Sequence, residues 1–210
     1  MKHLILSAFF TFSVLLSFSQ DKKTLQEFGI NIKSSIPKGL KKGDKAPNFS
    51  AINQFGKTVE LSQVLKSGTV VLVFYRGEWC GYCNKHLAAL QDGLENISAA
   101  GATVIAVTPI HSVGIQQTIS KTEVNFAIVS DVDLNIMRDY DVAFDVTQDY
   151  QDMLLKHLNN DLTLSNASGQ AVLPVPATYI INQKRKISKV FFDPNYKNRS
   201  SAEDILKAIQ

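Results

Sequence analysis

Residues 69–83 read TVVLVFYRGEWCGYC, from Thr69 to Cys83. The first part, Thr69–Tyr75, is a continuous apolar and β-branched run, which is typical of a strand buried on both faces. From Cys80 to Ile97, apolar residues recur in alternating steps of three and four, the pattern of one face of an α-helix. The segment therefore predicts a buried strand that leads through a short loop into a helix with two cysteines at its start.

The chain around this segment alternates between strand and helix patterns. The expected strands are Phe49–Ile52, Thr58–Leu61, Thr69–Tyr75, Thr103–Thr108, Asn125–Val129, Ala177–Asn182 and Ile187–Phe192. The expected helices are one from Cys80 that Gly101 ends, His111–Thr122, Leu134–Tyr140, Gln148–Leu158 and Ala202–Ile209, with a loop at residues 159–170. This order predicts an α/β three-layer sandwich, with a mixed, mainly parallel central sheet, a C-terminal antiparallel pair and helices on both faces.

The N-terminal residues have the layout of a secretory signal peptide. A basic start is followed by an uncharged apolar run, Leu4–Phe18, and by a small-x-small triplet that ends at Ser19. The alternative is a membrane anchor, but the run is shorter than the roughly 20 residues that span a bilayer. We expect a signal peptide at 1–19, a polar arm at 20–42 with a helical turn near Leu25–Ile32, and one domain at 43–210. The mature protein is then exported, to the periplasm or another extracytoplasmic space.

Composition limits the classes of function. A net charge of +3, spread along the chain, does not indicate a nucleic-acid partner. The chain has only two cysteines, Cys80 and Cys83. Closing so short a loop contributes about 2 kcal/mol, against about 4.7 kcal/mol for a loop of a hundred residues. A working dithiol therefore explains the pair better than a structural disulfide does.

The position of the two cysteines favours thiol chemistry. Free N–H groups and the partial positive charge at a helix N-terminus stabilise a thiolate, which is the reactive form. Cys80 lies at the helix tip and Cys83 one turn inside, so the simplest division makes Cys80 the attacking thiolate and Cys83 the resolving thiol. Arg76 is expected either as a solvated cation or as a charge that lowers the pKa of the thiolate. Trp79 is expected to pack over the site.

Other uses of these residues are weaker. A zinc site could combine Cys80, Cys83 and His86 with the unplaced His111 and His157, but there is no second C-x-x-C. His86, one turn past Cys83, is expected on the helix surface; the alternative is a base for the thiols. Covalent haem attachment requires a histidine where this chain has asparagine, directly after the second cysteine. No nucleotide, flavin or phosphate motif is evident, so we expect neither a metal nor a cofactor.

A proline lies directly before an expected strand, in the sequence Val175-Pro176-Ala177. Proline is tolerated at a strand start, and an X–Pro bond is the type that can be cis. We expect Pro176 to support the dithiol; the alternative is a simple break between loop and strand.

Four longer segments carry a family resemblance. They are GDKAPNFSAINQFGKTVELS, VVLVFYRGEWCGYCNKHL, FAIVSDVDLNIMRDYDV and VPATYIINQKRKISKVFFDPNY. In this order they resemble the AhpC/TSA peroxiredoxin-like family, from about Lys42 to the C-terminus. The surroundings of Trp79–Cys83 and Pro176 are also similar to TlpA/ResA-like exported thiol–disulfide reductases. Both resemblances imply a thioredoxin-like fold, in which the proline at position 176 is cis and packs against the dithiol.

The two resemblances imply different substrates. The first implies reduction of hydroperoxides by a cycle of Cys80 and Cys83, regenerated by a thioredoxin-like or other thiol electron donor. The second implies exchange with protein disulfides; a non-catalytic interaction module is a further alternative. Typical peroxiredoxins carry the signature P-x-x-x-T-x-x-C, whose cysteine attacks the peroxide. In the alignment that the resemblance implies, Cys83 takes the place of this cysteine. Cys80 then stands where the signature has threonine, and Arg76 where it has proline. The family also has a distant arginine that helps to hold the peroxide, and Pro176 stands at its position. His86 stands where the family usually has a glutamate, three residues after the cysteine. Which cysteine attacks first is left open.

Overall fold

The computed structural model describes residues 24–209, and the order of its central sheet is β5-β4-β3-β8-β9. These strands are β3 (Thr69–Phe74), β4 (Ala102–Thr108), β5 (Ala127–Ser130), β8 (Ala177–Ile181) and β9 (Ile187–Phe192). The first three run parallel, whereas β8 is antiparallel to β3, and β9 is antiparallel to β8. The mixed sheet with its C-terminal antiparallel pair confirms the predicted topology.

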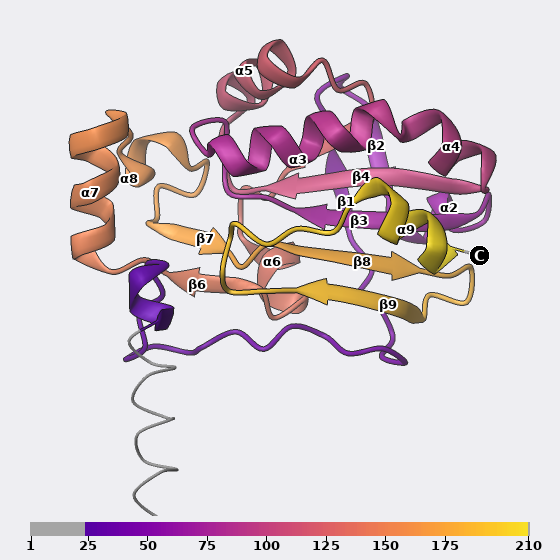
Figure 1. Ribbon diagram of the computed structural model, residues 1–210, viewed down its shortest axis with the longest axis horizontal. Helices are drawn as coiled ribbons and strands as arrows, with labels where there is room; N and C mark the ends of the chain where they lie inside the picture. The colour runs from indigo at the N-terminus through magenta and orange to yellow at the C-terminus, as the bar shows by residue number, and fades with distance from the viewer. Residues whose placement is uncertain (1–23, 210) are drawn as a thin grey trace, which may run out of the picture.

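Helices cover both faces of this sheet (Figure 1). On one face lie α3 (Gly81–Asp92), α4 (Leu94–Ala99), α5 (Ser112–Thr122) and α9 (Ala202–Ile209). On the other lie α2 (Leu61–Val64), α6 (Asn135–Asp139) and a hairpin of β1 (Ser50–Ile52) and β2 (Thr58–Glu60). Strand β3 serves both layers, because Val71 and Val73 pack toward α3 while Leu72 and Phe74 pack toward α6. The predicted three-layer sandwich is confirmed.

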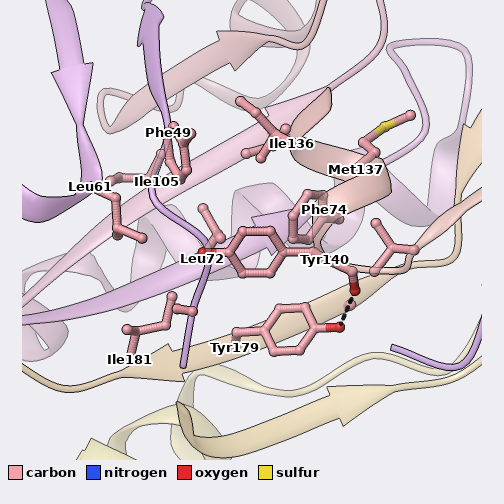
Figure 2. Close-up of a cluster of buried hydrophobic side chains, with 14 of the residues drawn as sticks. Phe49, Leu61, Leu72, Phe74, Ile105, Ile136, Met137, Tyr140, Tyr179 and Ile181 are labelled. Carbon is pink, nitrogen blue, oxygen red and sulfur yellow. Dashed lines mark hydrogen bonds between the residues drawn. The ribbon is translucent and has the colours of Figure 1, made fainter. Parts of the chain in front are cut away.

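An aromatic group fills the layer beneath β3 and β8 (Figure 2). The rings of Phe74, Tyr140 and Tyr179 are fully buried and lie 5.3–6.0 Å apart between centroids. The hydroxyl of Tyr179 donates to the carbonyl of Tyr140 at 3.3 Å, which satisfies a polar group that burial would otherwise leave unpaired. These rings fix α6 against the sheet.

A smaller unit lies at the end of the sheet that carries the cysteines. It contains α7 (Gln148–Leu158), α8 (Leu162–Ser165) and the antiparallel pair β6 (Ala143–Asp145) and β7 (Val172–Pro174). The sequence predicts α7, but α8 and the two three-residue strands are too short to show a periodicity. The unit has its own apolar cluster, to which Ile30 of the N-terminal arm also belongs.

The predicted helix from Cys80 to Gly101 is wrong in one respect, because it is two helices. Gly93 separates α3 from α4, with φ −89° and ψ −1°. A Cβ at Gly93 would lie only 2.7 Å from the Cβ of Ala202 in α9. The apolar steps of three and four continue across the junction, so the pattern alone does not reveal it.

The structure covers only part of the N-terminal region for which predictions were made. The signal peptide expected at residues 1–19 lies outside the described residues. The helical turn expected near Leu25–Ile32 is found at residues 24–27, and Ile30 pairs with Val146 of the domain. Over residues 24–209, no helix has the length and apolar character needed to cross a membrane.

Candidate redox site

Cys80 and Cys83 form a disulfide at the N-terminus of α3, with their Cα atoms 5.2 Å apart. Cys80 is the residue before the helix, with extended backbone, and its Sγ accepts the N–H of Cys83 at 3.3 Å. Strand β3 ends at Phe74, and a loop of six residues carries the chain to the helix tip. Both cysteines are buried, and Cys83 has no exposed surface. The two sulfurs therefore meet where the sequence predicts, at the positive end of a helix dipole.

Arg76 in this loop is buried and contacts Cys80. One terminal nitrogen of its guanidinium lies 3.2 Å from the Sγ of Cys80, and the other donates to the hydroxyl of Tyr150 at 2.8 Å. The guanidinium also lies over the ring of Tyr196, at 3.6 Å from the centroid, and over that of Trp79, at 5.0 Å. Arg76 is therefore a buried neighbour of the sulfur and not a solvated cation, while its effect on the pKa of the thiolate stays a prediction.

A second arginine, which the sequence analysis missed, contacts the other sulfur. Arg199, in the loop between β9 and α9, points a terminal nitrogen at the Sγ of Cys83 at 3.3 Å. Its Nε donates to the carbonyl of Tyr196 at 2.9 Å, which fixes the loop. Burial, and then the charge of Arg76, lower the pKa of Arg199 to about 9. No local pattern marks Arg199, because 116 residues separate it from Cys83.

Trp79 packs against two apolar clusters and lines the space beside Cys80, and its role as a cover over the site stays a prediction. A Cβ on Gly77 would lie 2.5 Å from the Nε1 of the indole. Glycine at position 77 therefore lets the indole fold back over the loop.

A cavity of about 410 Å³ opens beside Cys80. Aromatic residues form much of its wall, including Trp79, Tyr150 and Tyr196, and Lys85 and His157 add basic groups. Tyr150 comes from α7, and its pKa is raised, mainly by burial. Cys80 and Arg76 both line this cavity.

The structure corrects the expectation for Pro176. The bond before it is trans, and residues 24–209 contain no cis peptide bond. The chain passes almost directly from β7 into β8, and the Val175 N–H donates to the carbonyl of Val142 at 2.8 Å. A trans bond before Pro176 keeps the backbone extended between β7 and β8. The trans form is also the one that X–Pro bonds favour, by about 0.5–1 kcal/mol. Pro176 lines a hollow together with Arg199. The support that Pro176 is expected to give the dithiol stays a prediction.

His86 is buried, with 7% of its surface exposed, and not on the helix surface as expected. Burial, followed by the charge of Arg199, lowers its pKa to about 4, so the imidazole is neutral at pH 7. Neither ring nitrogen has a hydrogen-bond partner. In the described part of the chain, no three His, Cys, Asp or Glu side chains come together in a way that could hold a metal ion.

The layered fold and the dithiol at the start of α3 define a thiol oxidoreductase of the thioredoxin-like class. Comparison with known proteins narrows this class. The model of the AhpC/TSA family matches residues 42–190, and the chain belongs to that family.

Similar proteins come from both branches that the sequence resembles. The chain is 27% identical to the thiol-disulfide oxidoreductase ResA of Bacillus subtilis over 152 residues, which are 72% of this chain and 67% of the relative. It is 32% identical to a chloroplastic peroxiredoxin Q of Triticum aestivum over 107 residues, 51% of this chain and only 49% of the relative.

Solved structures confirm the fold. The peroxidoxin BcpB of Mycobacterium tuberculosis superposes with a TM-score of 0.62 at 19% identity, over 81% of this chain and 94% of that one. A putative thiol:disulfide interchange protein DsbE of Chlorobium tepidum gives 0.56 at 22% identity, over 81% and 99%.

Proposed function

We propose that this protein reduces hydroperoxides through a dithiol–disulfide cycle of Cys80 and Cys83. The observation that carries the proposal is the position of Cys80, which lines the cavity and whose sulfur lies 3.2 Å from the buried guanidinium of Arg76. A cation at this distance stabilises the thiolate and can polarise the O–O bond of a bound peroxide. The peroxiredoxin relatives support the same reading.

The proposed cycle begins at Cys80. The Cys80 thiolate attacks the terminal oxygen of the hydroperoxide, the O–O bond breaks, and the departing alkoxide takes a proton and leaves as an alcohol. Cys80 is then a sulfenic acid. Cys83 attacks its sulfur, the S–O bond breaks, and the hydroxide leaves as water after taking a proton, so that the disulfide forms. A thiol protein of the thioredoxin type returns two electrons and two protons. We assign the first attack to Cys80 because Cys80 lines the cavity and Cys83 does not.

Exchange with protein disulfides is the second candidate function. The similarity to ResA favours it, and so do the exposed side chains of Tyr82 and Leu158 that line the cavity, which offer an apolar surface to a polypeptide. Here Cys80 attacks a substrate disulfide and Cys83 resolves the mixed disulfide. A Cys83→Ser variant would accumulate such adducts in extracts of the source cells.

Peroxide consumption by the pre-reduced protein, with a thiol reductant present, tests the first function. We expect turnover in the wild type and none in the Cys80→Ser/Cys83→Ser double variant. A wild-type rate equal to that of the double variant would eliminate the peroxidase, and trapped mixed disulfides would then support the second function.

The layout along the chain belongs to the same proposal. Residues 1–19 are a signal peptide cleaved after Ser19, residues 20–42 an arm, and residues 43–210 the catalytic domain, which works outside the cytoplasm. N-terminal sequencing of the mature protein from an exporting host should begin at Gln20; a start at Met1 would contradict the layout.

A further inference from the structure

The two cysteines are each contacted by their own arginine. Arg76 meets the Sγ of Cys80 at 3.2 Å, and Arg199 meets that of Cys83 at 3.3 Å. Arg76 is 3% exposed. Within residues 24–209, the only salt bridge to an aspartate or glutamate joins Lys207 and Glu203. Neither guanidinium at the disulfide therefore has a carboxylate partner in this part of the chain. A buried cation, Arg76, and a partly buried one, Arg199, therefore share one neutral disulfide.

Cations that are withdrawn from water, wholly or in part, without a counter-ion are unfavourable. The lowered pKa of Arg199 reflects this cost, which arises from burial and then from Arg76. Reduction of the disulfide supplies the anion that is missing, because a thiolate at Cys83 faces the guanidinium at hydrogen-bond distance. Of the other groups nearby, His86 of α3 is neutral at pH 7 and the hydroxyl of Ser200 is bonded to Thr178. Neither is a charged partner or a base for Cys83.

We propose that Arg199 holds Cys83 as a thiolate and so makes it the nucleophile that closes the disulfide. The inference rests on the proposed function only in assigning the second step to Cys83. In that step the Cys83 thiolate forms the S–S bond, the S–O bond of the Cys80 sulfenic acid breaks, and hydroxide leaves with a proton as water. Arg199 stabilises the attacking sulfur and transfers no proton, so it is a positioning residue.

The first experiment measures the pKa of the Cys83 thiol in a Cys80→Ser background, from the rate of alkylation as a function of pH. An opposite charge at this distance lowers a pKa by about 1–3 units. We expect Arg199→Met to raise the pKa of Cys83 by at least one unit, and Arg199→Lys, which keeps the charge, to raise it less. Arg138→Met removes an exposed arginine of α6 and should leave the pKa unchanged. Thermal melts identify any variant that does not fold.

The second experiment follows the sulfenic acid at Cys80 with a dimedone-type probe after one equivalent of hydrogen peroxide. Arg199→Met should prolong its lifetime at least tenfold, while the rate of its formation stays within about twofold. An unchanged pKa of Cys83 in both Arg199 variants would overturn the inference, whatever the peroxide assay shows. A raised pKa without any reaction with peroxide would instead keep the role of Arg199 and refute the peroxidase.

Discussion

At the scale of single residues, Arg76 connects the sulfur to the aromatic wall of the cavity. Its guanidinium donates hydrogen bonds to the sulfur of Cys80 and to the hydroxyl of Tyr150, and it stacks on the ring of Tyr196. Arginine is suited to this position because its planar fork can donate in two directions while its face covers a ring. The sequence shows Arg76 next to the motif, but its burial depends on tyrosines far away in the chain.

Arg76→Met should slow alkylation of Cys80 at pH 7 at least tenfold in the reduced protein. The physical reason is that the neighbouring cation lowers the pKa of a thiol by about one unit or more. Mass spectrometry of the two modified cysteines measures the rate at each. The same rate in Arg76→Met and in the matched surface variant Arg138→Met would contradict a role for this charge.

His86 should make the protein less stable in mild acid. Its pKa is about 4 in the folded state against an ordinary 6.5, so the unfolded chain binds the proton first as the pH falls. The free energy of unfolding should decline from about pH 6.5 to about pH 4, by about 3 kcal/mol from this group, since each pKa unit is worth about 1.4 kcal/mol. Urea unfolding at pH 7 and 4.5 measures the decline.

The comparison variant for this titration is His86→Gln, which removes the ionisable ring. We expect a smaller loss of stability between the two pH values in this variant. An equal loss would assign the acid sensitivity to another group.

Residue-level prediction from sequence succeeds where a signal is local. The pair Cys80 and Cys83 follows from a spacing of three at a strand-to-helix junction. Arg199 and the trans bond at Pro176 do not follow from any neighbouring pattern. The arginine reaches the site through tertiary packing, and the isomer of the bond is set by the path from β7 to β8.

At the scale of elements, the junction of α3 and α4 is where α9 packs closely. Gly93→Val should destabilise the fold by about 1–3 kcal/mol, the usual range for inserting carbon atoms into a packed site. The new Cβ would lie 2.7 Å from that of Ala202 and would push α9 outward. Chemical denaturation measures the effect.

Gly81→Ala is the matched control for this junction, because an added Cβ meets nothing within 4 Å and the position begins α3. Its stability should be unchanged or slightly higher, since alanine restricts the unfolded chain. Equal stabilities of the two variants would show that α9 adjusts to the larger residue.

The long elements were predicted, and so were the short β1, β2 and α6, whereas β6, β7 and α8 were not. The bounds predicted for α7 and α9 agree with the structure, because both carry an apolar stripe over two or more turns. Strands β6 and β7 have three residues each and pair with each other across α7 and α8, so sequence proximity gives no hint of their partnership.

At the scale of the whole molecule, the fold should not depend on the disulfide. Three apolar clusters hold the layers together, and only one of them includes the cysteines. Reducing the bond should lower the free energy of unfolding by no more than about 2 kcal/mol, because the closed loop is so short. Urea unfolding with and without a phosphine reductant measures the difference.

A cooperative loss of structure on reduction at room temperature would contradict this prediction. The Cys80→Ser/Cys83→Ser variant serves as its control, because the reductant should not change its stability. Retained structure is what a protein that alternates between dithiol and disulfide requires.

The position of Arg199 late in the chain has a consequence for biosynthesis. A nascent polypeptide contains both cysteines 116 residues before it contains this guanidinium. Until β9 and the following loop have folded, Cys83 keeps the reactivity of an ordinary thiol, with a pKa of about 8.5. On this view the pair reaches full reactivity only in the completed protein, and chains still emerging from the ribosome are spared premature cross-linking.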